Sequence, residues 1–318
     1  MREFPVRKND AGQRLDRFAA KTVPLLPAAL LQKYLRLKRI KLNGKGAKRD
    51  DRVAEGDTVQ FYINDEFFDT PKAENAYLTV SAPKPEIVYE DENILLVDKK
   101  PGQAVHPHDG AEYGRTLIDH IQAYLYAKGE WKPREENAFA PALCNRIDRN
   151  TGGIVIAAKN AEAMRILNEK IKNRELTKEY LCVTVGAPEP PAGTIRCFLL
   201  KNEKKNLVSV YHKPVAGAKT AVTHYRTLQV KNGLALVSVE LETGRTHQIR
   251  ASFADRGHPL LGDGKYGIGA KNRACGEAYQ CLYAYRLTFS FTTDAGILGY
   301  LAGKTFQVRD VPFRGKYF

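Results

Sequence analysis

Two short clusters of charged residues could carry chemistry in this chain. In the first, NRIDRNTGG at 145–153, Asp148 stands between Arg146 and Arg149 on a glycine-ending turn that enters an apolar strand. Two guanidinium groups beside one carboxylate favour its ionised form, which suits Asp148 to act as a nucleophile rather than as a general acid. An exposed Arg-Asp-Arg turn without chemistry would look the same, and the local sequence alone favours that alternative.

The second cluster, LETGRTHQIRASFADRGHPLLGDGKYG at 241–267, combines a turn at Thr243-Gly244, a helix predicted from Thr246 and a glycine-rich loop. The glycine-rich loop holds His258 and Asp263, and Arg245 stands between the turn and the helix. His247, Arg250 and Asp255 could be a metal or acid–base set, but no second ligand recurs at helical spacing beside His247, so we predict no metal site. GDGKYG lacks the preceding strand and the spacing of a phosphate-binding loop, which excludes a nucleoside triphosphate site.

The elements that must position these clusters are mostly strands. IVYEDENILLVDKKPG (87–102) predicts two strands around a turn, and GGIVIAAK (152–159) predicts a buried strand. Alternating stretches then follow, at 179–185, 219–230, 234–242 and 285–291. Besides the helix from Thr246, helices are predicted in this region at 115–129 and after Asn160, a capping residue. This pattern predicts an α+β domain over 87–318 with a large mixed, mostly antiparallel sheet.

The first 60 residues form a separate basic unit. They hold 15 Lys or Arg and 7 Asp or Glu, a net charge of +8, in a chain of 318 residues with a net charge of +14. A helix and a hairpin at Asn43-Gly44 carry what we call the N-terminal basic set: Lys33, Arg36, Lys38, Arg39 and Lys45. A solvated basic face is the alternative. The segments 13–21, 30–45 and 53–63 resemble the alpha-L RNA-binding domain, which implies an RNA anchor over 1–64 and a linker over 65–86.

Composition restricts the class of protein. No apolar run approaches the ~18 residues that span a bilayer, and the first residues lack a secretory signal. Five cysteines without a CxxC pair argue against disulfides and zinc and favour a reducing cytoplasm. The basic balance favours a polyanionic partner, either nucleic acid or an acidic membrane surface.

Taken in order, the segments 86–107, 145–160, 177–186, 243–267 and 279–291 closely resemble the RluA-type family of RNA pseudouridine synthases. The resemblance implies an isomerase that breaks the bond from ribose C1′ to uracil N1, turns the base and rejoins it through C5. No cofactor and no metal are implied, and the partner is RNA rather than a membrane. The basic unit at the N-terminus is typical of members that act on ribosomal RNA.

The resemblance also assigns roles. Asp148 matches the catalytic carboxylate, Tyr180 the tyrosine that packs on the base and assists a late proton abstraction, and Arg250 the cation that pairs with the aspartate. Arg146 matches the side chain that fills the gap left by the flipped nucleotide. The remaining RNA-binding candidates are Arg149, Arg245, His247 and the N-terminal basic set. The alternatives are a core aromatic for Tyr180, a surface cation for Arg250 and a phosphate contact for Arg146.

The chain departs from the family pattern at three positions. Asn145, Ile147 and Gly152 stand where the family has His, Leu and Ser. These departures leave open a non-catalytic RNA-binding or ribosome-assembly protein, whereas a glycosidase would need a second carboxylate near Asp148. Large-subunit rRNA is the expected substrate and tRNA the alternative. The sequence does not choose between attack and ribose proton abstraction by Asp148, and a monomer is expected.

Overall fold

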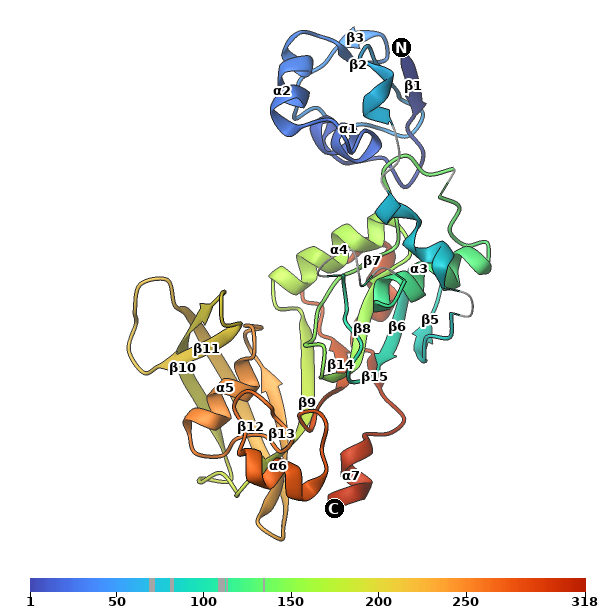
Figure 1. The fold of residues 1–318 in the computed structure, drawn as a ribbon. Coiled ribbons are helices and arrows are strands. Elements are labelled where there is room, and N and C mark those ends of the chain that lie inside the picture. Colours follow the sequence, from blue (N-terminus) through green and yellow to red (C-terminus); the bar gives the residue numbers. More distant parts are fainter. Residues whose placement is uncertain (69–71, 81–82, 108–111, 113, 134) are drawn as a thin grey trace.

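A four-stranded sheet and two helices form the N-terminal unit in the computed structural model, which describes residues 1–68, 72–80, 83–107, 112, 114–133 and 135–318 (Figure 1). Its elements are β1 (Arg2–Pro5), α1 (Leu15–Thr22), α2 (Ala28–Arg36), β2 (Ile40–Leu42), β3 (Lys45–Gly46) and β4 (Thr58–Phe61), with strand order β1-β4-β2-β3. Fully buried Leu15, Phe18, Ile40 and Phe61 give it a core of its own. The expected helix and the hairpin around Asn43-Gly44 are therefore both present.

One long sheet makes up the rest of the protein. Its strand order is β11-β10-β12-β13-β9-β14-β8-β6-β5, with β15 paired to β14 and β7 paired to β8. The bounds are β5 (Ile87–Glu90), β6 (Ile94–Lys99), β7 (Ala142–Leu143), β8 (Gly152–Ala158), β9 (Leu176–Val185), β10 (Ala192–Asn202), β11 (Leu207–Tyr211), β12 (Lys219–Lys231), β13 (Leu234–Leu241), β14 (Leu282–Phe289) and β15 (Thr305–Gln307). All pairs are antiparallel except β14 with β8, which run parallel over two residue pairs. The predicted mixed, mostly antiparallel sheet is confirmed.

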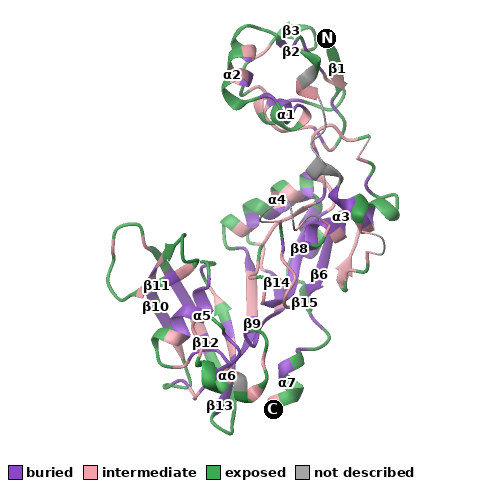
Figure 2. Ribbon diagram, in the orientation of Figure 1, coloured by how far each residue is buried: buried purple, intermediate pink, exposed green. Residues whose placement is uncertain are grey.

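Strands β6 and β8 are buried on both faces, which explains their continuous apolar runs. Leu95 and Val155 point to the side covered by α3 (Leu117–Ala127), and Leu96 and Ile156 point to the side covered by α4 (Ala161–Lys172). The Asn160 side chain accepts a hydrogen bond from the Ala163 amide and so caps α4 as expected. Figure 2 shows this buried centre between exposed helix faces.

The other half of the sheet supports a single helix, α5 (Gln248–Asp255). Ile249 and Phe253 of α5 pack on Tyr225 and the apolar residues of β10, β12 and β13. The helix begins at Gln248, two residues later than predicted, because His247 has a left-handed backbone conformation that ends the preceding turn. The remaining elements are α6 (Gly269–Cys275), η4 (Gly296–Leu301) and α7 (Pro312–Tyr317).

The segment expected to be an irregular linker contains two 3-10 helices, η1 (Asp65–Phe68) and η2 (Lys72–Thr79). Tyr77 of η2 packs against Trp131 in the core beneath α3, whereas Phe67 and Phe68 pack on the N-terminal core. Short 3-10 turns have no strong sequence period, so the pattern missed them. Within the described residues, no helix is long and apolar enough to cross a membrane. All five cysteines are free.

Candidate active site

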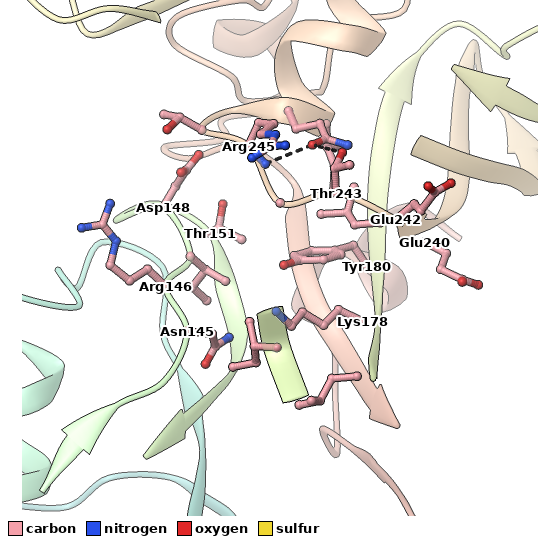
Figure 3. Close-up of a pocket in the computed structure, with 18 of the residues that line it drawn as sticks. Asn145, Arg146, Asp148, Thr151, Lys178, Tyr180, Glu240, Glu242, Thr243 and Arg245 are labelled. Carbon is pink, nitrogen blue, oxygen red and sulfur yellow. Dashed lines mark hydrogen bonds between the residues drawn. The ribbon is translucent and has the colours of Figure 1, made fainter. Parts of the chain in front are cut away.

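A cleft of about 730 Å³ opens where the two halves of the sheet meet. It is lined by the loop before β8, by β9 and by the loop between β13 and α5, and it contains Asp148, Tyr180 and Arg250. Figure 3 shows Asp148 and Tyr180 on opposite walls, with Arg146 turned away from both. The volume lies within the range of ligand pockets in proteins. Three sequence segments separated by tens of residues therefore converge on one cavity.

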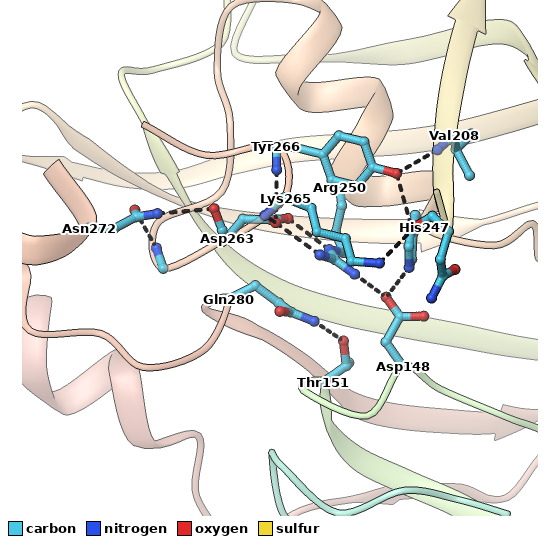
Figure 4. Close-up of polar contacts among 12 residues, drawn as sticks. Asp148, Thr151, Val208, His247, Arg250, Asp263, Lys265, Tyr266, Asn272 and Gln280 are labelled. Atoms are coloured by element: carbon cyan, nitrogen blue, oxygen red, sulfur yellow. Dashed lines mark hydrogen bonds and ion pairs between the residues drawn. The ribbon is translucent and has the colours of Figure 1, made fainter. Parts of the chain in front are cut away.

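The turn that carries Asp148 is held by hydrogen bonds from several sides. The Thr151 amide donates to the Asp148 carbonyl at 3.0 Å, and the Thr151 hydroxyl accepts from buried Gln280 at 3.1 Å (Figure 4). The Gly102 amide donates to the Arg149 carbonyl at 2.9 Å. These bonds tie the turn to both neighbouring segments, so the backbone beneath Asp148 has little freedom.

Lys99, at the end of β6, strengthens this support. It is fully buried, and its Nζ donates to the carbonyls of Lys100, Gln103 and Arg149 at 3.0, 2.9 and 2.8 Å. Burial lowers the pKa of Lys99 to about 7, against the attraction of Asp148 and Asp98. One buried amine thus joins the loop after β6 to the turn of Asp148.

The carboxylate of Asp148 is held through one of its two oxygens. Arg250 Nη1 donates to Oδ2 at 2.8 Å, and His247 Nε2 lies 3.9 Å from the same oxygen. Oδ1 has no hydrogen-bond partner in the part of the chain that the structure describes. The carboxylate is about a quarter exposed, with a side-chain relative accessibility of 27%. Asp148 therefore presents one engaged oxygen and one free oxygen.

The charge partners of Asp148 differ from those that the local sequence suggested. Arg149 is exposed and bonds to Glu112 at 2.5 Å, and Arg146 forms no ion pair within the described residues. The prediction that these two neighbours would flank the carboxylate was wrong, because adjacent side chains on a tight turn point in different directions. Arg250, 102 positions away in sequence, takes that role.

Arg250 is itself fixed by Asp263, whose part in the site the sequence patterns did not reveal. Arg250 Nε and Nη2 donate to the two oxygens of Asp263 at 2.7 and 2.9 Å, and both side chains are buried. Burial would raise the pKa of Asp263, but Arg250 and the amides of Lys265 and Tyr266 hold it below its usual value. The only signal for this residue was its place in the glycine-rich loop of the matched motif.

The second acidic candidate lies elsewhere. Asp255, at the end of α5, is 3.5 Å from His212 and forms no hydrogen bond or ion pair with His247 or Arg250. Helical spacing put Asp255 on the same helix as Arg250, but five positions along an α-helix turn a side chain to another face. In the described part of the chain, no group of three or more His, Cys, Asp or Glu could hold a metal ion.

Strand β9 supplies the opposite wall. Tyr180 and Lys178 are two positions apart, so they share one face of the strand, and Figure 3 shows both beside the cavity. Burial and the charge of Asp148 raise the pKa of Tyr180, so its hydroxyl stays protonated at neutral pH. Burial lowers the pKa of Lys178, which has no ion-pair partner in the described residues. Lys178 lies in the matched segment 177–186, but no sequence pattern indicated a role for Lys178.

Two departures from the family pattern have structural reasons. Asn145 Oδ1 accepts a hydrogen bond from the Ile156 amide at 2.7 Å, and this bond attaches the loop before Asp148 to β8. At Gly152, a Cβ would lie 2.2 Å from the Tyr283 ring, so Tyr283 occupies the space that a serine side chain needs. The Tyr283 hydroxyl donates to buried Asp98 at 2.7 Å, which holds the ring there. Both departures thus affect the support of the turn and leave Asp148 in place.

The remaining basic candidates fall into two groups. Arg245 lines the cavity and is exposed, with its Nε bonded to the Thr220 carbonyl at 3.1 Å. The N-terminal basic set is exposed around α2 and the β2–β3 hairpin, in a unit that Figure 1 shows beyond α4, away from the cavity. The structure therefore joins Arg245 and His247 to the site but not the N-terminal basic set.

Comparison with known proteins agrees with this geometry. The RNA pseudouridylate synthase family model matches residues 93–255, which include the Asp148 turn, β9 and α5. An uncharacterized RNA pseudouridine synthase of Mycoplasma genitalium is 33% identical over 296 residues, covering 90% of this chain and 88% of the relative. The chain belongs to the RNA pseudouridine synthase family.

Other family members agree. Ribosomal large subunit pseudouridine synthase D of Escherichia coli is 32% identical over 263 residues, covering 82% of this chain and 75% of the relative. The solved structure of human RNA pseudouridylate synthase domain containing 4 shares the fold, with a TM-score of 0.57 at 19% identity over 76% of this chain and 94% of that one. The predictions of the RluA-type family, of an isomerase and of an α+β fold are confirmed.

Proposed function

We propose that this protein converts specific uridines of large-subunit ribosomal RNA into pseudouridine, with Asp148 as the catalytic carboxylate. The observation that carries the proposal is the free Oδ1 of Asp148 in a nucleotide-sized cleft, while Oδ2 is held by Arg250. The ribosomal substrate rests on the activity for which the Escherichia coli relative is named. We extend the proposal to a monomeric enzyme of the cytoplasm that needs no cofactor.

In the proposed reaction, uridine leaves its stack and enters the cleft, because the bond that changes is inaccessible in a paired base. The C1′–N1 bond breaks, C5 bonds to C1′, the hydrogen on C5 leaves as a proton and N1 gains one. Asp148 acts either by attack through Oδ1 or by removing a ribose proton. Its Arg250 partner holds the carboxylate in one orientation at the start of either route.

The other wall of the cleft would hold the base. Tyr180 is buried in the wall with a protonated hydroxyl, which favours packing and hydrogen bonding over unaided proton abstraction. Arg146 is exposed beside the opening and has no ion-pair partner among the described residues, which leaves it available to enter the gap in the RNA. Arg149, Arg245 and His247 complete the proposed RNA contacts at the cleft.

The N-terminal unit, residues 1–64, would anchor the RNA without taking part in the chemistry. The buried residues of its core all lie between Val6 and Ile63, with Phe67, Phe68 and Ala138 packed against them, and the N-terminal basic set is exposed. Phosphate contacts from such a set position an RNA without specifying bases. Residues 65–86 join this anchor to the catalytic domain, 87–318.

The test is Asp148→Asn, which keeps the size of the side chain and removes its charge. We expect a folded protein that binds large-subunit rRNA and forms no pseudouridine, measured by chemical mapping of rRNA taken from cells lacking the protein. Turnover within tenfold of wild type would refute the role of Asp148. Modification of tRNA alone would replace the rRNA substrate, and binding without modification by the wild type would favour an assembly protein.

A further inference from the structure

His247 is held in an unfavourable backbone conformation. Its φ of 52° and ψ of 21° lie in the left-handed region, which residues with a Cβ rarely adopt. The residue is 9% exposed, and its ring faces the cleft between Asp148 and Tyr266. Such strain persists only where the surrounding structure enforces it, and it is concentrated at functional sites. The position of this ring is therefore a specific feature of the site.

The hydrogen bonds around Tyr266 indicate which nitrogen of His247 carries a proton. The Val208 amide donates to the Tyr266 hydroxyl oxygen at 2.8 Å, so the tyrosine accepts there. His247 Nδ1 lies 2.8 Å from the same hydroxyl, and we assign the tyrosine as the donor of this bond because its oxygen already accepts from Val208. Burial raises the pKa of Tyr266 and lowers that of His247 to about 4, so the phenol keeps its proton and the imidazole is neutral at pH 7. A neutral imidazole that accepts at Nδ1 carries its hydrogen on Nε2.

Tyr266 also contacts Arg250, which donates to the Asp148 carboxylate. The guanidinium carbon of Arg250 lies 5.3 Å from the centre of the Tyr266 ring, and the ring meets that of His247 edge-on at 5.6 Å. Arg250 Nη1 and His247 Nε2 lie 2.8 and 3.9 Å from Oδ2 of Asp148. One tyrosine, anchored to β11 through Val208, thus contacts both groups that face this oxygen.

We propose that Tyr266 and His247 form a positioning pair that selects the reacting oxygen of Asp148. Tyr266 fixes the Nε2–H tautomer of His247, which turns a positive N–H edge toward Oδ2 at 3.9 Å while Arg250 holds the same oxygen by a hydrogen bond, so Oδ1 faces the uridine. This inference rests on the proposed function of Asp148 but adds two residues and a protonation state to it. Without the tyrosine hydroxyl, His247 could place its proton on Nδ1 and turn a lone pair toward the carboxylate, which would repel it.

The test measures the tautomer directly on the full chain labelled with ¹⁵N-histidine. Long-range ¹H–¹⁵N correlation spectra distinguish the two neutral forms from the imidazolium, and His247→Gln identifies the His247 signal among the seven histidines. We expect Nε2–H at pH 7 in the wild type and loss of this single form in Tyr266→Phe. Wild-type protein with Nδ1–H, or with imidazolium at pH 7, would overturn the proposal whether or not Asp148 proves catalytic.

Activity gives an independent readout. The loss of one neutral hydrogen bond should slow the single-turnover rate of Tyr266→Phe on large-subunit rRNA by about 3- to 10-fold, with RNA affinity unchanged. Gln can place an N–H where Nε2–H lies, so His247→Gln should be faster than His247→Leu. Equal rates for these two variants, or a wild-type rate for Tyr266→Phe, would refute the positioning role.

The matched control is Tyr225→Phe. Tyr225 also packs on α5 and loses one buried hydrogen bond, from its hydroxyl to the Pro190 carbonyl at 3.0 Å. It does not contact His247, so the tautomer and the rate should both stay at wild type. A change in the tautomer of this control would mean that α5 responds to any packing defect, which would also overturn a specific role for Tyr266.

Discussion

Replacing Asp263 by Asn tests whether the support of Arg250 limits the rate. The substitution keeps the shape of the side chain, and its oxygen can still accept from the Lys265 amide, now 2.8 Å from Oδ1. It removes the negative charge that receives two of the three hydrogen bonds from Arg250 to carboxylates. The guanidinium then keeps Asp148 as its only carboxylate partner among the described residues.

The expected magnitude follows from burial and charge. Removing one partner of a buried ion pair costs about 3–5 kcal/mol in free energy of unfolding. Because Arg250 keeps Asp148 as a second carboxylate partner, the cost of Asp263→Asn should lie at the lower end, about 3 kcal/mol. Loosening one charge-assisted hydrogen bond, from Arg250 to Asp148, is worth about 1.5–3 kcal/mol. If the reaction needs that alignment, the rate should fall about 10- to 100-fold.

The assay is the single-turnover rate of pseudouridine formation on large-subunit rRNA, paired with denaturant unfolding of the same protein. Glu175→Gln is the control, because its carboxylate forms a comparably buried pair with Lys170 at 2.9 Å and bonds none of the Asp148 cluster. Both variants should be less stable, but only Asp263→Asn should be slower. An Asp263→Asn rate within threefold of wild type would refute the argument that Arg250 must be held.

Four further outcomes are expected. Burial lowers the pKa of His247 to about 4 from an unfolded value near 6.5, so between these pH values the unfolded chain binds a proton at His247 and the folded chain does not. The free energy of unfolding should therefore be highest above pH 6.5 and fall by up to about 3 kcal/mol as pH falls toward 4. Urea unfolding should show this loss in the wild type and not in His247→Gln. Lys178→Met should weaken RNA binding without changing the fold, read by filter binding and circular dichroism, with Lys178→Arg as the control that keeps the charge. Alanine at all five members of the N-terminal basic set should make the dependence of log affinity on log salt concentration less steep by up to about 4. An unchanged slope would mean that these side chains are solvated and do not contact RNA phosphates. Gly152→Ser should cost about 1–3 kcal/mol in thermal unfolding because its Cβ meets Tyr283, and Tyr283→Ala in the same chain should relieve that clash.

Secondary structure was largely readable from the order of residues. The alternation in 179–185 and 219–230 and the apolar runs that became β6 and β8 report burial directly, because side chains on a strand point to opposite faces. The cap at Asn160 and the basic helix α2 are equally local features. The 3-10 helices around Tyr77 lack such a period, and the start of α5 was displaced by the left-handed backbone of His247.

The candidate for the reacting group was also readable, but only because the motifs stand in a known order. Taken alone, Arg146-Ile147-Asp148-Arg149 is indistinguishable from a solvated turn. The ordered motifs around Asp148, Tyr180 and Arg250 resembled one family, and comparison over most of the chain confirmed membership. Lys178 and Asp263 lie inside the same motifs, but the resemblance assigned no role to either of them.

What the sequence by itself determined was the family, the strand-rich fold and the basic N-terminal unit, and it also singled out Asp148 as the candidate carboxylate. Which groups surround that carboxylate was decided only by the tertiary structure. Arg146 and Arg149 are neighbours of Asp148 in the chain but diverge from it on a tight turn, whereas the pairing of β13 with β9 and of β14 with both β9 and β8 brings Arg250 within 2.8 Å. Contact between side chains depends on strand register and on the direction in which each Cβ points, and neither is a property of nearby residues in the chain.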